Sequence, residues 1–265
     1  MPTRTGAQII WECLVHEGVQ TVFGYPGGAI LPAYDAMLDY PVRHVLVRHE
    51  QGATHMADGY ARAGGGVGVA IATSGPGATN MVTGIATAMM DSSPIVCITG
   101  QVPSKLIGYD AFQETDISGI TLPITKHSYL VTRVEDIMPA MKEAFHLAKS
   151  GRPGPVLVDI TKDAQQAPLD WEWDPQPVSM RGYRPDSPAA SGDELAKAVG
   201  LVRGAQRPVI LAGQGVIQSG AMRELIQFAE LIDSPIAMTL LGLGGVPASH
   251  PEVSSIIPSR RSVLR

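Results

Sequence analysis

One carboxylate stands where a buried strand gives way to a helix. Glu50 lies in "LVRHEQGATHMADGYARA", between an apolar strand-like run and a helix-like run. A carboxylate at this position can stabilise the helix N-terminus through the helix dipole, or it can hold a proton at a bound ligand. The segment alone favours the helix-stabilising role, so the neighbouring loops must decide between the two.

Three further loops carry residues suited to ligand binding: "GYPGG" at 24–28, "TSGPGATN" at 73–80 and "GQVP…DAFQE" at 100–114. Glycines before a helix let a ligand approach the backbone, where free N–H groups attract an anion. The second loop lacks the Lys-Ser/Thr pair of a Walker loop and does not fit G-x-G-x-x-G. For the first loop, a tight turn without a ligand remains an open alternative. The second loop could be a generic phosphate cradle, and in the third an aromatic ring could simply pack under the loop.

Helix-like and strand-like segments alternate along the first 160 residues. Strands are expected at 21–26, 42–47, 66–74, 94–100 and 155–160, and helices at about 6–17, 29–40, 51–63, 77–93 and 134–149. The strands are almost continuously apolar, which is typical of parallel strands covered on both faces. The fold class is therefore α/β with a parallel sheet. Ligands bind such sheets at the carboxyl ends of the strands, where the four loops lie.

A stretch rich in Pro, Asp and Ser interrupts this pattern. We predict a first domain over 1–165, a linker over 166–190 and a second α/β domain over 191–265. In the second domain, helices are expected at 193–205 and 221–234, and strands at 208–216 and 235–242. The tail "VSSIIPSRRSVLR" shows no further βα unit, so this domain is predicted to be incomplete.

Composition excludes several partners. The net charge of −5 argues against nucleic acid as the main partner. Apolar runs are too short to span a bilayer, and the N-terminus lacks a signal-peptide pattern, so we expect a cytoplasmic location and no membrane. Cys13 and Cys97 fit buried positions, and no zinc-like spacing is present, so no metal ligands are assigned.

Seven segments occur in an order that is similar to that of the thiamine-diphosphate-dependent enzyme family: "FGYPGGAILPAYDAM", "RHEQGATHMADGYARA", "ATSGPGATN", "ITGQVP", "DAFQETDISGI", "TKHSYLV" and "SGRPGPVLVDI". Within the family, the chain resembles the N-terminal half of the large catalytic subunit of acetolactate synthase (acetohydroxyacid synthase) over about residues 5–250. The resemblance implies a pyrimidine-binding domain followed by an incomplete FAD-binding-like domain.

The resemblance also implies residue roles. Glu50 is the cofactor-activating, catalytic glutamate, with thiamine diphosphate contacts at Gly24, Tyr25, Pro26, Thr73, Pro76, Asn80 and Gln113. Substrate contacts are implied at Gly28, Ala29, Val102, Pro103, Phe112, Gln113 and Lys162, with an oxyanion-type role for the Gly28 and Ala29 backbone. FAD contacts are implied at Arg152, Gly213, Gln214, Gly215, Thr239 and Leu240, although Gln214 departs from the family's "GGGV" run.

The implied reaction is decarboxylation of pyruvate and addition of the two-carbon unit to pyruvate or 2-ketobutyrate, in isoleucine and valine biosynthesis. It implies thiamine diphosphate, FAD and Mg²⁺, a homodimer or larger assembly, and a small regulatory subunit. The family's Gly-Asp-Gly segment, which holds Mg²⁺ and diphosphate, is missing from this sequence. We therefore hypothesise a truncated or frameshifted form with little activity of its own.

Other interpretations remain open. A pyruvate oxidase or sulfoacetaldehyde acetyltransferase shares "TKHSYL" and "GRPGPVLVDI", whereas "DAFQETDISGI" favours acetolactate synthase. Glyoxylate carboligase is disfavoured because that enzyme lacks the glutamate. A non-catalytic fragment is a third interpretation.

Overall fold

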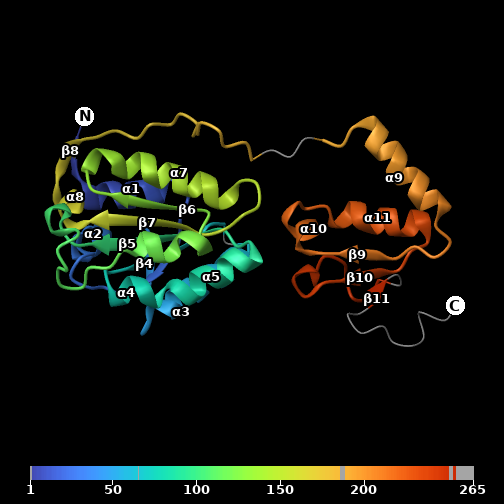
Figure 1. Ribbon diagram of the computed structural model, residues 1–265, viewed down its shortest axis with the longest axis horizontal. Helices are drawn as coiled ribbons and strands as arrows, with labels where there is room; N and C mark the ends of the chain where they lie inside the picture. The colour runs from blue at the N-terminus through green and yellow to red at the C-terminus, as the bar shows by residue number, and fades with distance from the viewer. Residues whose placement is uncertain (1, 65, 186–188, 251–252, 255–265) are drawn as a thin grey trace. The chain divides into compact units, whose positions relative to one another are not determined.

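A computed structural model describes residues 2–64, 66–185, 189–250 and 253–254. The chain divides into two compact units, Met1–Ser187 (unit 1) and Pro188–Arg265 (unit 2), which are described separately (Figure 1). Within the described residues, no helix is both long and apolar enough to cross a membrane.

Unit 1 alternates strands and helices along most of its length. Its strands are β1 (Thr3–Thr5), β2 (Thr21–Gly24), β3 (Arg43–Leu46), β4 (Gly68–Ala72), β5 (Ile95–Gln101), β6 (His127–Val131), β7 (Val156–Thr161) and β8 (Pro168–Asp170). Its α-helices are α1 (Gly6–His16), α2 (Leu31–Ala36), α3 (Glu50–Arg62), α4 (Pro76–Asn80), α5 (Val82–Asp91), α6 (Ile117–Thr121), α7 (Ile137–Lys149) and α8 (Lys162–Gln166). Short 3-10 turns are η1 (Met37–Asp39), η2 (Ser104–Leu106), η3 (Leu122–Ile124) and η4 (Val134–Asp136).

Six of these strands form one parallel sheet in the order β3-β2-β4-β5-β7-β6. The order reverses direction between β2 and β4, and in open α/β sheets the ligand-binding crevice lies at the carboxyl ends of the strands at this switch point. The predicted α/β class with a parallel sheet is confirmed.

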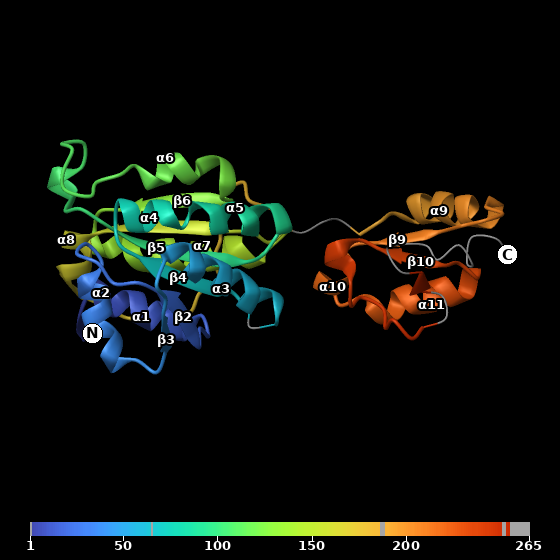
Figure 2. The ribbon, with the colours of Figure 1, turned by 90° about the horizontal axis from the view of Figure 1, so that it is seen from below.

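Successive side chains along a strand point alternately into two separate hydrophobic cores, one on each face of the sheet. Val69 and Ile71 pack in the cluster formed with α1 and α7, whereas Ala70 and Ala72 pack in the cluster formed with α3 and α5. Figure 2 shows the helices on either side of the sheet. This two-residue alternation explains why the strands read as continuously apolar.

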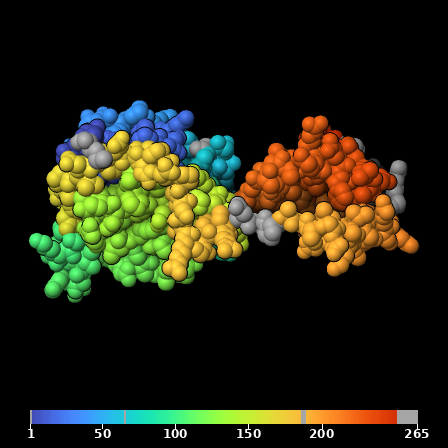
Figure 3. Space-filling model, turned by 90° about the horizontal axis from the view of Figure 1, so that it is seen from above, coloured from blue at the N-terminus to red at the C-terminus, as the bar shows by residue number. Residues whose placement is uncertain are grey.

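The segment predicted as a linker is partly fixed to unit 1. β8 pairs antiparallel with β1, and Trp171 is buried beyond it. The Trp173 ring stacks on His16 at 4.4 Å between centroids, and Lys142 Nζ donates to the Asp174 carbonyl at 2.6 Å. Figure 3 shows this yellow segment lying along the surface of unit 1. Aromatic residues in a Pro-rich stretch were the signal for this packing.

Unit 2 holds a small parallel sheet in the order β11-β10-β9. Its elements are α9 (Gly192–Gly204), β9 (Ile210–Ala212), α10 (Gln214–Gln218), α11 (Met222–Ile232), β10 (Ile236–Met238), the 3-10 turn η5 (Leu240–Gly242) and β11 (Val253–Ser254). The tail expected to lack a βα unit thus contributes two residues to a strand, and residues 255–265 lie outside the described residues.

Several expected elements differ in detail. The helix expected over 77–93 is divided at Met81 into α4 and α5. β6 was not predicted, because only Val131 in it is fully buried and its apolar pattern is weak. α10 starts within the strand expected at 208–216, where the chain turns at Gly213.

Candidate functional site

Glu50 begins α3 directly after β3, beside the crevice. His49 caps the helix, since its Nδ1 accepts from the Gln51 N–H at 3.1 Å. The Glu50 side chain is 8% exposed, and its Oε2 accepts from Asn80 Nδ2 at 2.9 Å. A glutamate serving only the helix dipole would gain by pointing into water. Here the carboxyl is instead buried and hydrogen-bonded to a side chain of α4.

The helix that carries Asn80 approaches Glu50 very closely. A Cβ atom at Gly77 would lie 3.3 Å from Glu50 Oε1 and 2.7 Å from Thr73 Cγ2. Thr73 follows β4, and Pro76 occupies the first turn of α4, where its missing N–H costs no helix hydrogen bond. The structure therefore brings Glu50, Thr73, Pro76 and Asn80 together at the switch point of the sheet.

The turn after β2 forms the other side of this crevice. Gly24 ends β2, and a Cβ there would strike Ile71 of β4, so the two strands are closely apposed. The Tyr25 N–H donates to the Ile71 carbonyl at 3.3 Å, while the Tyr25 side chain is largely exposed. Gly24, Tyr25 and Pro26 thus lie beside the loop that carries Thr73.

A tyrosine that sequence reasoning missed lies near this crevice. Tyr34 of α2 forms a hydrogen bond at 3.1 Å between its hydroxyl and His44 Nε2. Burial and the charge of Glu50 both raise the pKa of Tyr34, and burial lowers the pKa of His44. The only sequence signal was a polar aromatic in "LPAYDAM", which is not specific.

A pocket of about 200 Å³ lies beside the loop that carries Thr73. It is lined by the residues implied for substrate, namely Gly28, Ala29, Val102, Pro103, Phe112, Gln113 and Lys162, together with Ser74. These residues come from three loops and the start of α8, yet they line one pocket. Phe112 is 87% exposed, which leaves its ring free for contact with a ligand or another chain.

The backbone of Ala29 is already engaged on both sides. Its N–H donates to Thr73 Oγ1 at 3.1 Å, and its carbonyl accepts from Gln165 Nε2 at 3.0 Å. Both groups are thus hydrogen-bonded within the chain, and the oxyanion-type role expected for the Gly28 and Ala29 backbone stays a prediction. Gln165, which is fully buried, was not singled out from the sequence.

Gly75 joins the crevice to the pocket. Its φ of +55° is a conformation that other residues adopt only with strain, and a Cβ there would lie 2.5 Å from the Gln113 carbonyl. Gln113 itself has a φ of +58°. The glycine in "TSGPGATN" thus permits the loop carrying Gln113 to touch the loop carrying Thr73.

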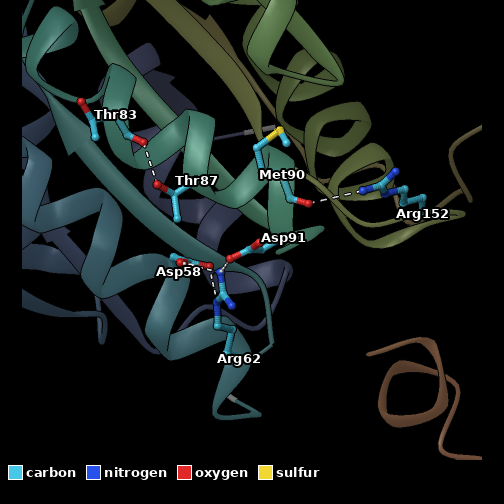
Figure 4. A network of polar contacts seen from close by, with 7 residues as sticks. All are labelled: Asp58, Arg62, Thr83, Thr87, Met90, Asp91 and Arg152. Carbon is cyan, nitrogen blue, oxygen red and sulfur yellow. Dashed lines mark hydrogen bonds and ion pairs between the residues drawn. The ribbon is translucent and has the colours of Figure 1, made fainter. Parts of the chain in front are cut away.

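The residues implied for FAD divide between the two units. In unit 1, Arg152 Nε donates to Ser92 Oγ at 2.6 Å and its guanidinium donates to the Met90 carbonyl at 3.4 Å, at the end of α5. Figure 4 shows this contact beside the Arg62–Asp91 ion pair, which joins α3 to the same helix end. In unit 2, the Thr239 N–H donates to the Ala212 carbonyl at 2.9 Å, at the carboxyl ends of β9 and β10. Gly213, Gln214, Gly215 and Leu240 follow those strand ends.

Two models of known protein families match this chain. A family model described as "Thiamine pyrophosphate enzyme, N-terminal TPP binding domain" matches residues 4–120, and one described as "Thiamine pyrophosphate enzyme, central domain" matches residues 195–260. The chain belongs to this family of thiamine pyrophosphate (thiamine diphosphate) enzymes and carries parts of both domains.

Within the family, similar curated proteins include acetolactate synthase large subunits. The protein from Corynebacterium glutamicum is 55% identical over 247 residues, which is 93% of this chain and 39% of that protein. A probable large subunit from Methanocaldococcus jannaschii is 52% identical over 248 residues, 93% of this chain and 42% of that protein. Isozyme 3 from Escherichia coli is 48% identical over 262 residues, 97% of this chain and 45% of that protein. The chain therefore spans less than half the length of these relatives.

Proposed function

We propose that this chain supplies the pyrimidine-binding half of a thiamine diphosphate site in an acetolactate synthase. The observation that carries the proposal is the buried Glu50 carboxyl, which is held by Asn80 at the switch point of the sheet. The similarity to acetolactate synthase large subunits, at about half identity over most of the chain, supports the reaction type.

The residues present fit the aminopyrimidine of the cofactor. Such a ring offers nitrogen donors and acceptors along its edge and an apolar face. Gly77 leaves the space beside Glu50 Oε1 clear, because any larger side chain would fill it. A carboxyl and a crevice wall of Gly and Pro are therefore suited to a flat, polar-edged ring.

The proposal gives a physical role to the residues that would meet the cofactor and the substrate. Glu50 would hold a proton at a nitrogen of the bound ring, and Asn80 fixes the orientation of the carboxyl through its 2.9 Å hydrogen bond. Thiamine diphosphate, when bound, supplies a carbon nucleophile that takes up the two-carbon unit of a 2-keto acid as carbon dioxide leaves. Lys162 and Gln113 in the adjacent pocket offer a cation and an amide for the carboxylate of pyruvate or 2-ketobutyrate.

The assembly and the other cofactors are parts of the same proposal. FAD is expected to contact Arg152 in unit 1 and the strand ends of β9 and β10 in unit 2. Mg²⁺ and the diphosphate are expected to be held by the family's Gly-Asp-Gly segment, which this sequence lacks. A homodimer or larger assembly with a small regulatory subunit is expected from the relatives, whose names include "large subunit".

A graft into a longer relative tests the proposal. Residues 4–250 of this chain replace the corresponding segment of the C. glutamicum large subunit, which is 55% identical. Acetolactate formed from pyruvate is measured with thiamine diphosphate, Mg²⁺ and FAD, and each cofactor is omitted in turn. We expect thiamine-diphosphate-dependent acetolactate at a rate within about tenfold of the parent enzyme. A folded graft that consumes pyruvate without making acetolactate would instead favour another enzyme of the family, and one that leaves pyruvate untouched would contradict the proposal. The 265-residue chain alone is expected to form little acetolactate.

A further inference from the structure

The loop between β5 and α6 supplies half of the pocket wall. It leaves the sheet at Val102, projects from the body of unit 1 and returns at Thr115 (Figure 2). Val102, Pro103, Phe112 and Gln113 of this loop line the pocket. The loop is tied to α8 near its start, where the Ser104 N–H donates to Asp163 Oδ1 at 3.0 Å, and its two ends must also be held for the pocket to keep its shape.

One side chain joins both ends of this loop. Gln101, the last residue of β5, accepts at Oε1 from the Val102 N–H at 2.9 Å. Its Nε2 donates to the Thr115 carbonyl at 2.9 Å. The Gln101 side chain is buried and does not line the pocket itself. A single amide group therefore closes the base of the loop.

The same amide is anchored to a buried carboxylate in the sheet. Gln101 Nε2 also donates to Asp159 Oδ2 at 2.9 Å, while Thr99 Oγ1 donates to Asp159 Oδ1 at 2.7 Å. Thr99 and Gln101 are two residues apart on β5 and thus share one face, and Thr99 pairs directly with Asp159 of β7. Asp159 is only 2% exposed, so its hydrogen bonds lie in a medium where they are strong.

Asp159 has no task in the proposed chemistry. Burial raises the pKa of Asp159 to about 6, while the hydrogen bonds from Thr99 and Gln101 oppose that rise and the charge of Asp116 adds to it. Keeping a carboxylate at this depth costs free energy. One of its hydrogen bonds comes from Thr99 and the other from Gln101, both on β5. Gln101 in turn contacts both ends of the loop between β5 and α6, which we call the pocket loop.

We propose that Gln101, anchored on Asp159, is a positioning residue that fixes the pocket loop at its base and so sets the affinity of the pocket for its 2-keto acid. The identity of the ligand rests on the proposed function, whereas the fixing of the loop does not.

Two substitutions exchange the donor and acceptor of the buried pair. Gln101→Glu keeps the length of the side chain but removes the donor and places a second carboxylate against Asp159. Adding Asp159→Asn returns a hydrogen bond between positions 101 and 159 in the opposite direction and leaves a single buried charge, but position 101 still has no donor for the Thr115 carbonyl. Gln20→Glu, at an exposed position of the same unit, is the matched control.

Amide hydrogen exchange of the 265-residue chain at pH 8 tests the fixing of the loop. In Gln101→Glu, we expect exchange across 102–115 to rise by about tenfold or more, with α1 and α7 unchanged. The double variant should keep most of this rise, because the Thr115 carbonyl still lacks its donor, and the control should match the wild type. An unchanged loop, a uniform rise over unit 1 or a full recovery in the double variant would each overturn the proposal, since full recovery would trace the effect to the paired carboxylates and not to the amide.

Kinetics of the C. glutamicum graft test the consequence for the pocket. Gln101→Glu should raise KM for pyruvate by about fivefold or more and change kcat by less than about twofold, because the loop binds substrate and transition state alike. The double variant should keep most of the rise in KM, because its loop still lacks the bond to the Thr115 carbonyl. A loop that exchanges faster without any rise in KM would overturn the positioning role. A graft without any activity would count against the proposed function, and the exchange result would still decide on the loop.

Discussion

Units 1 and 2 both alternate strands and helices, but they bury very different amounts of apolar surface. In unit 1, helices cover both faces of a six-stranded sheet, and two separate clusters fill the space. In unit 2, the sheet has three strands, and one cluster consists of Ala212, Ala229, Ile236, Met238 and Val246. Every residue of α9 is at least partly exposed, although Leu195 and Val199 are apolar. The same βα pattern therefore buries a smaller core in unit 2, and we expect unit 2 to be the less stable of the two.

The largest expected effect concerns the order of unfolding. The tryptophans Trp11, Trp171 and Trp173 all lie in unit 1, so their fluorescence reports that unit alone. Far-UV circular dichroism reports both units. Because unit 2 has the smaller core, we expect the dichroism to begin falling at a lower urea concentration than the fluorescence. Coincident transitions would contradict the comparison.

Core substitutions sharpen the same experiment. Phe145 is 1% exposed in the α7 core, so Phe145→Ala should lower the free energy of unfolding of unit 1 by about 3–5 kcal/mol and bring the two transitions together. Met238→Ala in unit 2 is the counterpart. It should shift the early dichroism change and leave the fluorescence transition in place.

A buried acid gives unit 1 a pH dependence that unit 2 should not share. The pKa of Asp159 is raised to about 6 by burial from an ordinary value of 3.8. The folded state therefore binds this proton more tightly, and wild-type unit 1 should lose stability as pH rises from about 4 to 6. An amide at this position does not titrate, so Asp159→Asn should gain up to about 3 kcal/mol relative to wild type across that window and then level off. Urea titrations followed by tryptophan fluorescence measure this difference. A difference that stays flat from pH 4 to 7 would contradict the assignment, and Glu135→Gln at an exposed site is the control.

A pair of glycines tests the close approach of two loops in the site. Gly75→Ala should destabilise unit 1 by about 1–3 kcal/mol, because its φ is +55° and the new Cβ would meet the Gln113 carbonyl. At Gly28, nothing lies within 4 Å of an added Cβ, so Gly28→Ala should change stability by less than about 0.5 kcal/mol. Similar losses for the two variants, measured by urea unfolding, would show that the loops do not meet as described.

The fold class and the main strands were accessible from sequence because continuous apolar runs and Gly-rich turns are local signals. The gathering of Val102, Phe112, Gln113 and Lys162 in one hollow came only from the resemblance, since these residues are distant along the chain. Gln101, Asp159 and Tyr34 gave no specific signal, because their roles depend on partners in other elements. Local pattern also failed at β6, whose exposed edge position weakens the apolar run.

The smallest expected effects compare the helix starts of the two units. Thr5 and Ser191 each form a capping box, at α1 and α9 respectively. Thr5→Ala should cost unit 1 about 1 kcal/mol in the fluorescence transition, because α1 is packed in the core. Ser191→Ala should reduce helical dichroism before unfolding and leave fluorescence unchanged, because α9 depends on its cap more than on packing. If the two variants changed fluorescence and circular dichroism equally, the caps of α1 and α9 would not differ in the way described.

The central claim is that Glu50 serves a bound cofactor as well as the start of α3, and its substitution in the C. glutamicum graft tests this most directly. Glu50→Gln keeps the shape and the Asn80 contact but removes the proton-holding carboxylate. We expect the rate of acetolactate formation at saturating thiamine diphosphate to fall by about 10²–10⁴-fold, with the unfolding transition nearly unchanged. Glu135→Gln should leave the rate intact. A Glu50→Gln graft as active as its parent would contradict the account.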